Sequence, residues 1–155
     1  MTDTADKLTG GCMCGAIRYQ VDGRPDRVLH CHCQSCRQHT GAAAATLAVF
    51  APEQVRFSGS ARKLFNSAPG VGRAFCPDCG SSLSWETTLG EEGICALHIS
   101  TFDDPEQLPA NGHSFYMERI SWFDIADELP RHAGFVRQTE PMCFGPQLAG
   151  KTDQR

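Results

Sequence analysis

The sequence predicts a mainly β protein that is rich in turns. Fifteen glycines and nine prolines are many for 155 residues, and both residue types interrupt long helices. Short alternating stretches recur between these breaks, as in Gly15–Val21, where Ile17, Tyr19 and Val21 alternate with polar residues. Hydrophobic residues make up 41% of the chain and charged residues 21%, close to globular averages, which argues against wholesale disorder.

The first half of the chain is expected to hold short strands and very little helix. Val28–Cys31 is predicted to be a short strand, and Gln34–His39 one or two helical turns. Ala42–Phe50 begins with four alanines that would suit a helix, but Thr46, Val49 and Phe50 before the Ala51-Pro52 break favour a strand. Two shorter strands are then predicted at Val55–Ser58 and Arg62–Asn66.

In the second half, alternation again predicts strands, at Leu83–Thr87 and Ile94–Ile99, joined by a turn at 90–93. Ser67–Gly72 is predicted to be a loop, Ser114–Arg119 a strand, and Trp122–Leu129 a short helix closed by Pro130. The segment Thr2–Leu8 is expected to be a loose polar leader, and Gly10-Gly11 a flexible approach to the first cysteine pair.

Composition and charge exclude several classes of protein. No apolar run approaches the roughly 18–20 residues of a membrane span, and the polar first ten residues do not resemble a secretory signal. The formal net charge is −4 and no basic run is present, which argues against binding to a nucleic-acid backbone. We therefore expect a cytoplasmic protein that has no membrane or nucleic-acid partner.

The nine cysteines indicate metal binding rather than disulfides. Nine is an odd number, and cysteines in the reducing cytoplasm mostly stay unpaired or hold metal. Cys76-Pro77-Asp78-Cys79-Gly80 is a zinc knuckle, in which Gly80 permits the left-handed backbone that closes the turn. A redox-active pair would instead be expected in a thioredoxin-like βαβ context, which this sequence does not show.

Cys12 and Cys14 can point their sulfurs to one side of an extended segment. Together with Cys76 and Cys79 they would complete four cysteines around a structural Zn²⁺. Spacing alone does not decide which pairs share an ion, and it does not distinguish zinc from iron in such a site.

The densest group of soft ligands lies between these pairs, at Leu29–Thr40. Cys31, Cys33 and Cys36 would share an ion and leave one position open, as catalytic zinc sites do. His39 is the best candidate within this stretch for a fourth ligand, whereas His32 is expected to point away from the Cys31/Cys33 face. A closed structural zinc site and metal-free thiols packed in a core are alternatives that the spacing leaves open.

The remaining candidate residues are expected to have ordinary roles. Cys95 is predicted to be a small core residue and Cys143 an inert residue of the C-terminal tail. Hydrogen-bonded or solvated side chains are predicted for His98, His113 and His132, and solvated surface positions for Arg37, Lys63, Arg73 and Arg119.

Three motifs together resemble the glutathione-dependent formaldehyde-activating enzyme family. They are G-x-C-x-C-G-x-I-x-Y at Gly10–Tyr19, H-C-x-x-C-R-x-x-x-G at His32–Gly41, and R-x-F-C-x-x-C-G-x-x-L at Arg73–Leu83. Two downstream stretches, Phe102–His113 and Trp122–Pro130, are also similar to the family. The S-A-P-G-V-G loop and the S-T-F-D-D stretch depart mildly from its usual pattern.

The resemblance implies a β-tent zinc fold made of small antiparallel sheets with one or two short helices. It further implies one zinc-binding domain over residues 1–155, with a core at about 10–132 and a C-terminal tail at 133–155. Two zinc ions are implied, a structural one on Cys12, Cys14, Cys76 and Cys79 and a functional one on Cys31, Cys33 and Cys36. The second ion is expected to be held less firmly because it has three protein ligands.

The activity implied by the resemblance is that of a zinc-dependent carbon–sulfur lyase or synthase. Its substrate would be glutathione or a related thiol adduct, such as S-hydroxymethylglutathione. The family also contains the centromere protein V relatives, so a non-catalytic zinc module that mediates protein interactions is the alternative. The sequence does not indicate an oligomeric state.

Overall fold

The computed structural model describes residues 7–89 and 93–142, and these residues form the mainly β fold that the sequence predicts. The smaller sheet is antiparallel, in the order β1 (Lys7–Gly11), β2 (Ile17–Asp22), β5 (Val55–Gly59). The larger sheet has the order β10-β3-β4-β9-β8-β7-β6. Its strands are β3 (Arg27–Cys31), β4 (Ala45–Phe50), β6 (Lys63–Ala68), β7 (Val71–Phe75), β8 (Ser82–Thr87), β9 (Ile94–His98) and β10 (Gly112–Ser114).

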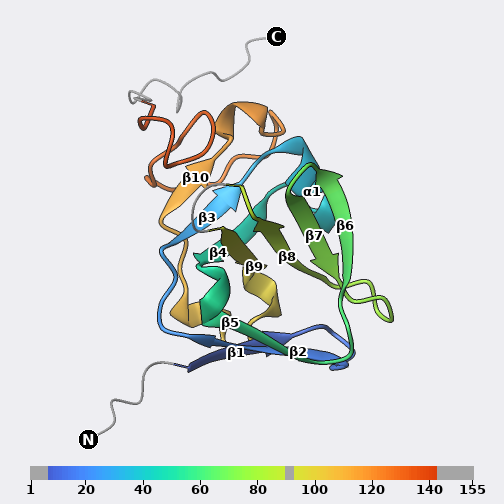
Figure 1. Ribbon diagram of the computed structural model, residues 1–155. Helices are drawn as coiled ribbons and strands as arrows, with labels where there is room; N and C mark the ends of the chain where they lie inside the picture. The colour runs from blue at the N-terminus through green and yellow to red at the C-terminus, as the bar shows by residue number, and fades with distance from the viewer. Residues whose placement is uncertain (1–6, 90–92, 143–155) are drawn as a thin grey trace, which may run out of the picture.

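The smaller sheet lies across one end of the larger one, at the bottom of the view in Figure 1. The main core fills the space between them. Tyr19 and Val21 of β2 pack there with Phe50 and Leu97 of the larger sheet, and all four side chains are at most 1% exposed. Phe102 adds a ring that meets Tyr19 edge-on, with the centroids 5.3 Å apart. The alternation that predicted β2 is therefore the alternation between this core and solvent.

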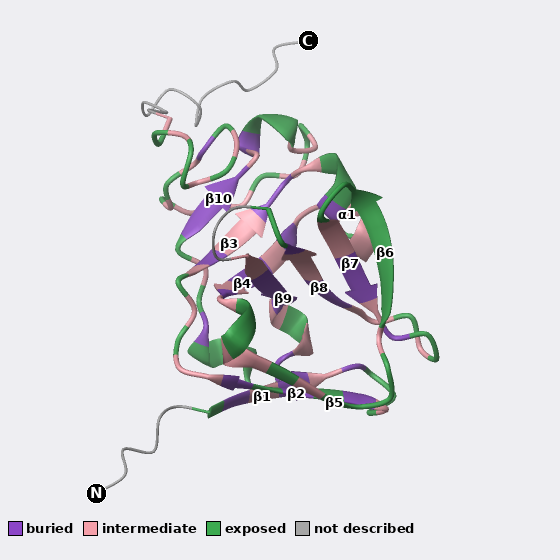
Figure 2. Cartoon of the chain, viewed as in Figure 1, coloured by how far each residue is buried: buried purple, intermediate pink, exposed green. Residues whose placement is uncertain are grey.

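The larger sheet has two different faces, because residues directly opposite each other on neighbouring strands point the same way. Leu29, Leu47 and His98 are paired across β3, β4 and β9 and share one face. That face also carries Cys31 and Ala45, which pack with the short helix α1 (Gln34–Thr40) through Cys36. Figure 2 shows that the central strands are buried or half-buried, whereas the edge strand β6 is exposed along its length.

Two loop predictions were wrong because the chain pairs where a loop was expected. Residues 7–11 form β1, which pairs with β2 from Lys7↔Asp22 to Gly11↔Arg18. In the predicted loop Ser67–Gly72, β6 runs on to Ala68 and β7 begins at Val71. Only Pro69 and Gly70 turn the chain, with Gly70 at φ +70°. A prolyl-glycyl turn of this kind needs no longer loop to reverse a strand.

Two predictions in the last third were also wrong. No strand forms over the expected range Ser114–Arg119. Strand β10, which runs parallel to β3, already ends at Ser114, because the next residue, Phe115, adopts a left-handed backbone (φ 53°). The helix expected at Trp122–Leu129 does not form, and Asp124 and Asp127 of this segment accept hydrogen bonds from Tyr116 and His113.

Beyond His132 the chain still contacts the larger sheet. The ring of Phe135 lies 4.8 Å from that of Phe115 and 6.3 Å from that of Trp85, and Arg137 forms an ion pair with Asp26. The predicted turn at 90–93 lies mostly outside the described residues, as do most of the predicted tail and Cys143. Across residues 7–89 and 93–142 the structure contains no helix long and apolar enough to span a membrane.

Candidate metal centres

Four cysteines from two distant turns come together at one end of the smaller sheet. Cys12 and Cys14 lie in the turn between β1 and β2, and Cys76 and Cys79 in the turn between β7 and β8. The knuckle closes as predicted, because Gly80 adopts φ +74° and its N–H donates to the Cys76 carbonyl at 2.9 Å. The Met13 N–H donates to the Ser81 hydroxyl at 3.0 Å and so connects the two turns directly.

The sulfur positions fit a tetrahedral ion. All four sulfurs lie within 4.8 Å of one another, with 3.5 Å between Cys12 and Cys14 and 3.8 Å between Cys14 and Cys76. Metal–sulfur bonds of about 2.3 Å place tetrahedral sulfurs about 3.8 Å apart, whereas a disulfide would bring two sulfurs to about 2.05 Å. These four side chains could therefore hold one metal ion.

Hydrogen bonds around Cys79 and Cys12 favour the thiolate form that a metal needs, whereas the interaction with Cys12 contributes to raising the pKa of Cys14 to about 12. The hydroxyl and backbone of Ser81 and the backbone of Cys14 lower the pKa of Cys79 to about 5. The Ile17 N–H approaches the Cys12 sulfur at 3.2 Å. Hydrogen bonds to the charged form of a thiol stabilise it, so the backbone around the knuckle favours thiolates, which bind cations.

The second group consists of Cys31, Cys33 and Cys36, whose sulfurs also lie within 4.8 Å of one another. Cys31 ends β3, Cys33 is the N-cap of α1, and Cys36 lies in its first turn. The Cys33 sulfur accepts the Cys36 N–H at 3.3 Å, as a side-chain cap does. Cys31 and Cys36 are 6% and 4% exposed, so this group lies deeper in the protein than Cys14 does.

The three thiols share protons unevenly. Hydrogen bonds from Cys31 and Cys36 hold the pKa of Cys33 well below its ordinary value, and the interaction with Cys33 raises the pKa of Cys31 in turn. A group of this kind has one thiolate already favoured and releases further protons when a cation binds.

His39, the predicted candidate for a fourth ligand, does not join this group. His39 belongs to α1, and its ring packs against that of His98 with the centroids 5.5 Å apart. Its Nε2 is buried without a hydrogen-bond partner among the described residues. No His, Asp or Glu of the described chain completes the second group, so it offers three protein ligands.

The prediction that His32 points away from the sulfurs agrees with its contacts. Its Nε2 lies 2.9 Å from Nδ1 of His113, and Nε2 of His113 lies 3.0 Å from both carboxylate oxygens of Asp127. Both rings are fully buried, and burial beside His113 and His30 lowers the pKa of His32 to about 4. This buried chain of polar groups anchors the loop between Cys31 and Cys33.

Arg73 corrects a further prediction, because it is not a solvated surface residue. Its side chain is on β7 and only 6% exposed, and its Nη1 donates to the Cys36 sulfur at 3.5 Å. Sequence spacing contains little sign of this contact, since residues 36 and 73 meet only through the pairing of the larger sheet. Arg37, Lys63 and Arg119, the other cations that were predicted to lie at the surface, do not contact the sulfurs of the described cysteines.

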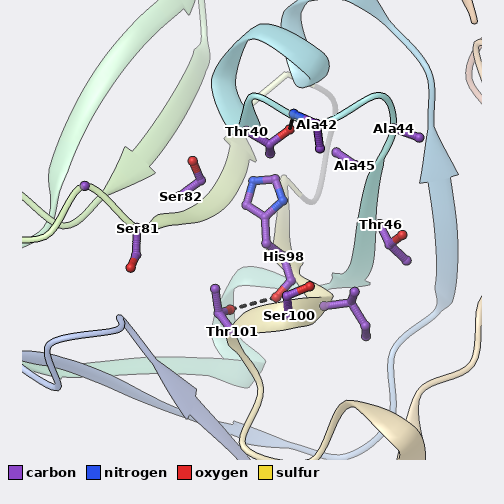
Figure 3. A pocket seen from close by; sticks show the side chains of 12 residues that line it. Thr40, Ala42, Ala44, Ala45, Thr46, Ser81, Ser82, His98, Ser100 and Thr101 are labelled. Carbon is purple, nitrogen blue, oxygen red and sulfur yellow. Dashed lines mark hydrogen bonds between the residues drawn. The ribbon is translucent and has the colours of Figure 1, made fainter. Parts of the chain in front are cut away.

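A pocket of about 390 Å³ opens at the C-terminal end of α1, where Thr40 and Ala42 line it together with Gly80 and Ser81, which follow Cys79 in the chain. Figure 3 shows that the His98 ring points into the pocket between Ser82, Ala45 and Thr40. The hydroxyls of Thr40, Ser82 and Thr101 already donate to carbonyls of Cys36, His39 and His98. The pocket wall is thus made largely of small side chains and hydroxyls, and Nε2 of His98 has no hydrogen-bond partner among residues 7–89 and 93–142.

Comparisons with known proteins agree with these observations. Residues 7–118 match the family model described as "Glutathione-dependent formaldehyde-activating enzyme". No curated protein matches the chain. Among the solved structures, a protein of Rhodobacter sphaeroides is 21% identical, with a TM-score of 0.53 over 64% of this chain and 93% of that one. At this identity the likeness extends to the fold alone.

Proposed function

The chain belongs to the glutathione-dependent formaldehyde-activating enzyme family, and from this premise we propose that it is a zinc-dependent carbon–sulfur lyase or synthase. Its substrate would be glutathione or a related thiol adduct, such as S-hydroxymethylglutathione. The observation that carries this proposal is the second cysteine group, where three converging sulfurs have no fourth protein ligand within the described chain. An ion held there keeps a position for an exogenous ligand.

The four-cysteine group would hold a second, structural zinc ion. Its four sulfurs satisfy a tetrahedral ion completely, so no position remains for a substrate. The ion would link the β1–β2 turn to the β7–β8 turn and stabilise the fold rather than take part in the reaction.

At the three-cysteine site a bound zinc ion would supply a Lewis-acidic position at which a thiol loses its proton. In the synthetic direction a bond forms between the thiol sulfur and the aldehyde carbon, and the carbonyl oxygen ends with the proton. The lyase direction reverses each change. Cys31, Cys33 and Cys36 would hold the ion, with Cys31 and Cys36 buried and Cys33 the more exposed member of the three.

We also propose that the chain works as one zinc-binding domain in the cytoplasm. The eight described cysteines are free thiols, which suits a reducing compartment. The three-cysteine group lies on the larger sheet and the four-cysteine group joins both sheets, which suits a single unit.

The test is to replace Cys36 with serine and to measure metal content and turnover of glutathione–formaldehyde adducts. We expect the variant to lose about one zinc ion per chain and its turnover. Cys95→Ser is the matched control, because Cys95 is buried in β9 and belongs to neither group. Two bound ions and full turnover in Cys36→Ser would contradict the proposal, and firm zinc binding without any response to thiols would favour the non-catalytic zinc module.

A further inference from the structure

Arg73 is a buried cation whose partner is a predicted metal ligand rather than a carboxylate. Its Nη1 donates to Sγ of Cys36 at 3.5 Å, and its Nε donates to the Ser67 hydroxyl at 3.1 Å. A guanidinium remains charged in proteins, and burying it without a partner is strongly unfavourable. The buried position of Arg73 is therefore compatible with folding only if negative charge lies beside it, and the sulfurs of the second cysteine group supply that charge.

The charge of the site explains what a cation can do there. Three thiolates around a divalent ion leave one net negative charge, and a substrate thiolate as the fourth ligand would add another. Close anions in a half-buried place repel each other strongly, because solvent screens them poorly. One positive charge beside Cys36 offsets this repulsion.

Two neighbouring histidines do not supply that positive charge. Burial, together with the proximity of His39 and Arg73, lowers the pKa of His98 to about 3, and burial beside Arg73 lowers the pKa of His39. Both rings are therefore neutral at pH 7. In addition, Nη2 of Arg73 donates to no acceptor in the described part of the protein, so it remains available to an incoming anion.

We propose that Arg73 is a positioning residue of the three-cysteine site, which allows an anionic thiolate to become the fourth ligand. The hydrogen bond from Arg73 withdraws electron density from the Cys36 sulfur, so that the ion becomes a stronger acceptor for a further sulfur. This assignment rests on the function proposed above. A purely structural role, in which Arg73 only ties β7 to α1, predicts different behaviour toward neutral ligands.

The experiment uses the cobalt-substituted protein and follows its sulfur-to-metal absorption during titration with glutathione, which binds as a thiolate, and with imidazole, which binds as a neutral molecule. Arg73→Gln is compared with Arg62→Gln. Arg62 is a matched control because it also lies beside the larger sheet, but it pairs with the carboxylate of Glu86 at 3.1 Å. Each variant thus loses one positive charge, and only one of them loses it beside a sulfur.

We expect Arg73→Gln to weaken glutathione binding by roughly tenfold to a hundredfold, as befits a lost charge-assisted hydrogen bond, and imidazole binding by less than about threefold. Arg62→Gln should leave both within about twofold of the wild type. Equal loss for the two ligands in Arg73→Gln would assign the residue a structural role and overturn the proposal. Unchanged glutathione binding would overturn it as well.

A second variant keeps the test decisive if Arg73→Gln does not fold. Ser67→Ala removes only the hydroxyl that holds Nε, from an exposed position on β6, and should weaken glutathione binding by about two- to fivefold without affecting imidazole. No selective effect there would contradict the assignment. A wild-type cobalt protein that does not respond to glutathione would contradict the proposed function itself, whereas a normal wild-type response with unaffected variants would contradict only the role of Arg73.

Discussion

Nε2 of His32 lies 2.9 Å from Nδ1 of His113, and this contact joins two positions 81 residues apart. His32 stands between Cys31 and Cys33, while His113 is on β10 and is held from its other side by Asp127. Arg131 reaches the same carboxylate at 3.2 Å. The geometry of the three-cysteine group therefore depends on a segment that contributes no sulfur to it.

Breaking this chain should destabilise the protein. In His113→Ala a fully buried ring is lost, and His32 and Asp127 both lose a hydrogen-bond partner. We expect the free energy of unfolding to fall by about 3 kcal/mol, measured by denaturant titration in the presence of zinc. Glu128→Gln is the control, because Glu128 is an exposed neighbour of Asp127, and it should change stability by less than about 0.5 kcal/mol. Similar losses in the two variants would mean that the buried chain is unimportant.

Stability should fall in mild acid because His98 is buried in its neutral form. The pKa of His98 is lowered from 6.5 to about 3 in the folded protein, so the unfolded chain binds the proton more readily. This contribution is complete above pH 6.5 and is lost as the pH falls toward 3. Between pH 7 and pH 5 the loss should be about 2 kcal/mol.

The measurement is the difference between wild type and His98→Leu, because acid also releases metal from both proteins and that part cancels in the difference. We expect the free energy of unfolding of the wild type to decrease by about 2 kcal/mol more than that of the variant over this range. An equal decrease would show that the pKa of His98 is the same in the folded and the unfolded protein, which would contradict the prediction.

Loss of the four-cysteine ion should affect folding more than loss of the other. Cys76 is fully buried and its group connects turns that lie far apart in the sequence. Cys76→Ser should bind one zinc ion rather than two and lose at least about 4 kcal/mol of stability, measured by metal analysis and thermal unfolding. Cys36→Ser should also lose an ion but keep most of its stability. The reverse order of stabilities would exchange the roles of the two groups.

The close approach of β1 to the 3₁₀ helix Ile99–Thr101, which follows β9, should not tolerate a larger residue. A Cβ at Gly10 would lie 2.3 Å from the Tyr19 hydroxyl and 2.4 Å from the Thr101 carbonyl oxygen. Gly10→Ala should therefore cost about 2–3 kcal/mol, measured by denaturant unfolding. Gly134→Ala, whose Cβ would meet its nearest atom at an ordinary 3.6 Å, serves as the control. Tolerance of both changes would mean that β1 moves away easily.

Strands β8 and β9 of the larger sheet were predicted well because their signal is local. Residues 83–87 and 94–99 alternate, and the structure places β8 and β9 there with ends shifted by one residue. The failures occurred where distant contacts decide the conformation. Lys7–Gly11 has no strong strand pattern of its own and becomes a strand because β2 is beside it. The segment 122–129 is irregular, and its aspartates bind partners elsewhere in the fold.

By itself, the sequence determined the local cysteine motifs, since spacings of two and three residues let neighbouring sulfurs turn toward a common point without help from the rest of the chain. That the pair Cys12 and Cys14 meets the pair Cys76 and Cys79 was decided by the tertiary structure. Tertiary structure alone decided that His39 packs against His98 instead of joining the sulfurs, that Arg73 lies beside Cys36, and that His32 is anchored through His113. These contacts depend on strand order and register in the larger sheet. Such long-range pairings cost chain entropy that many weak interactions must offset together, and no local pattern encodes them.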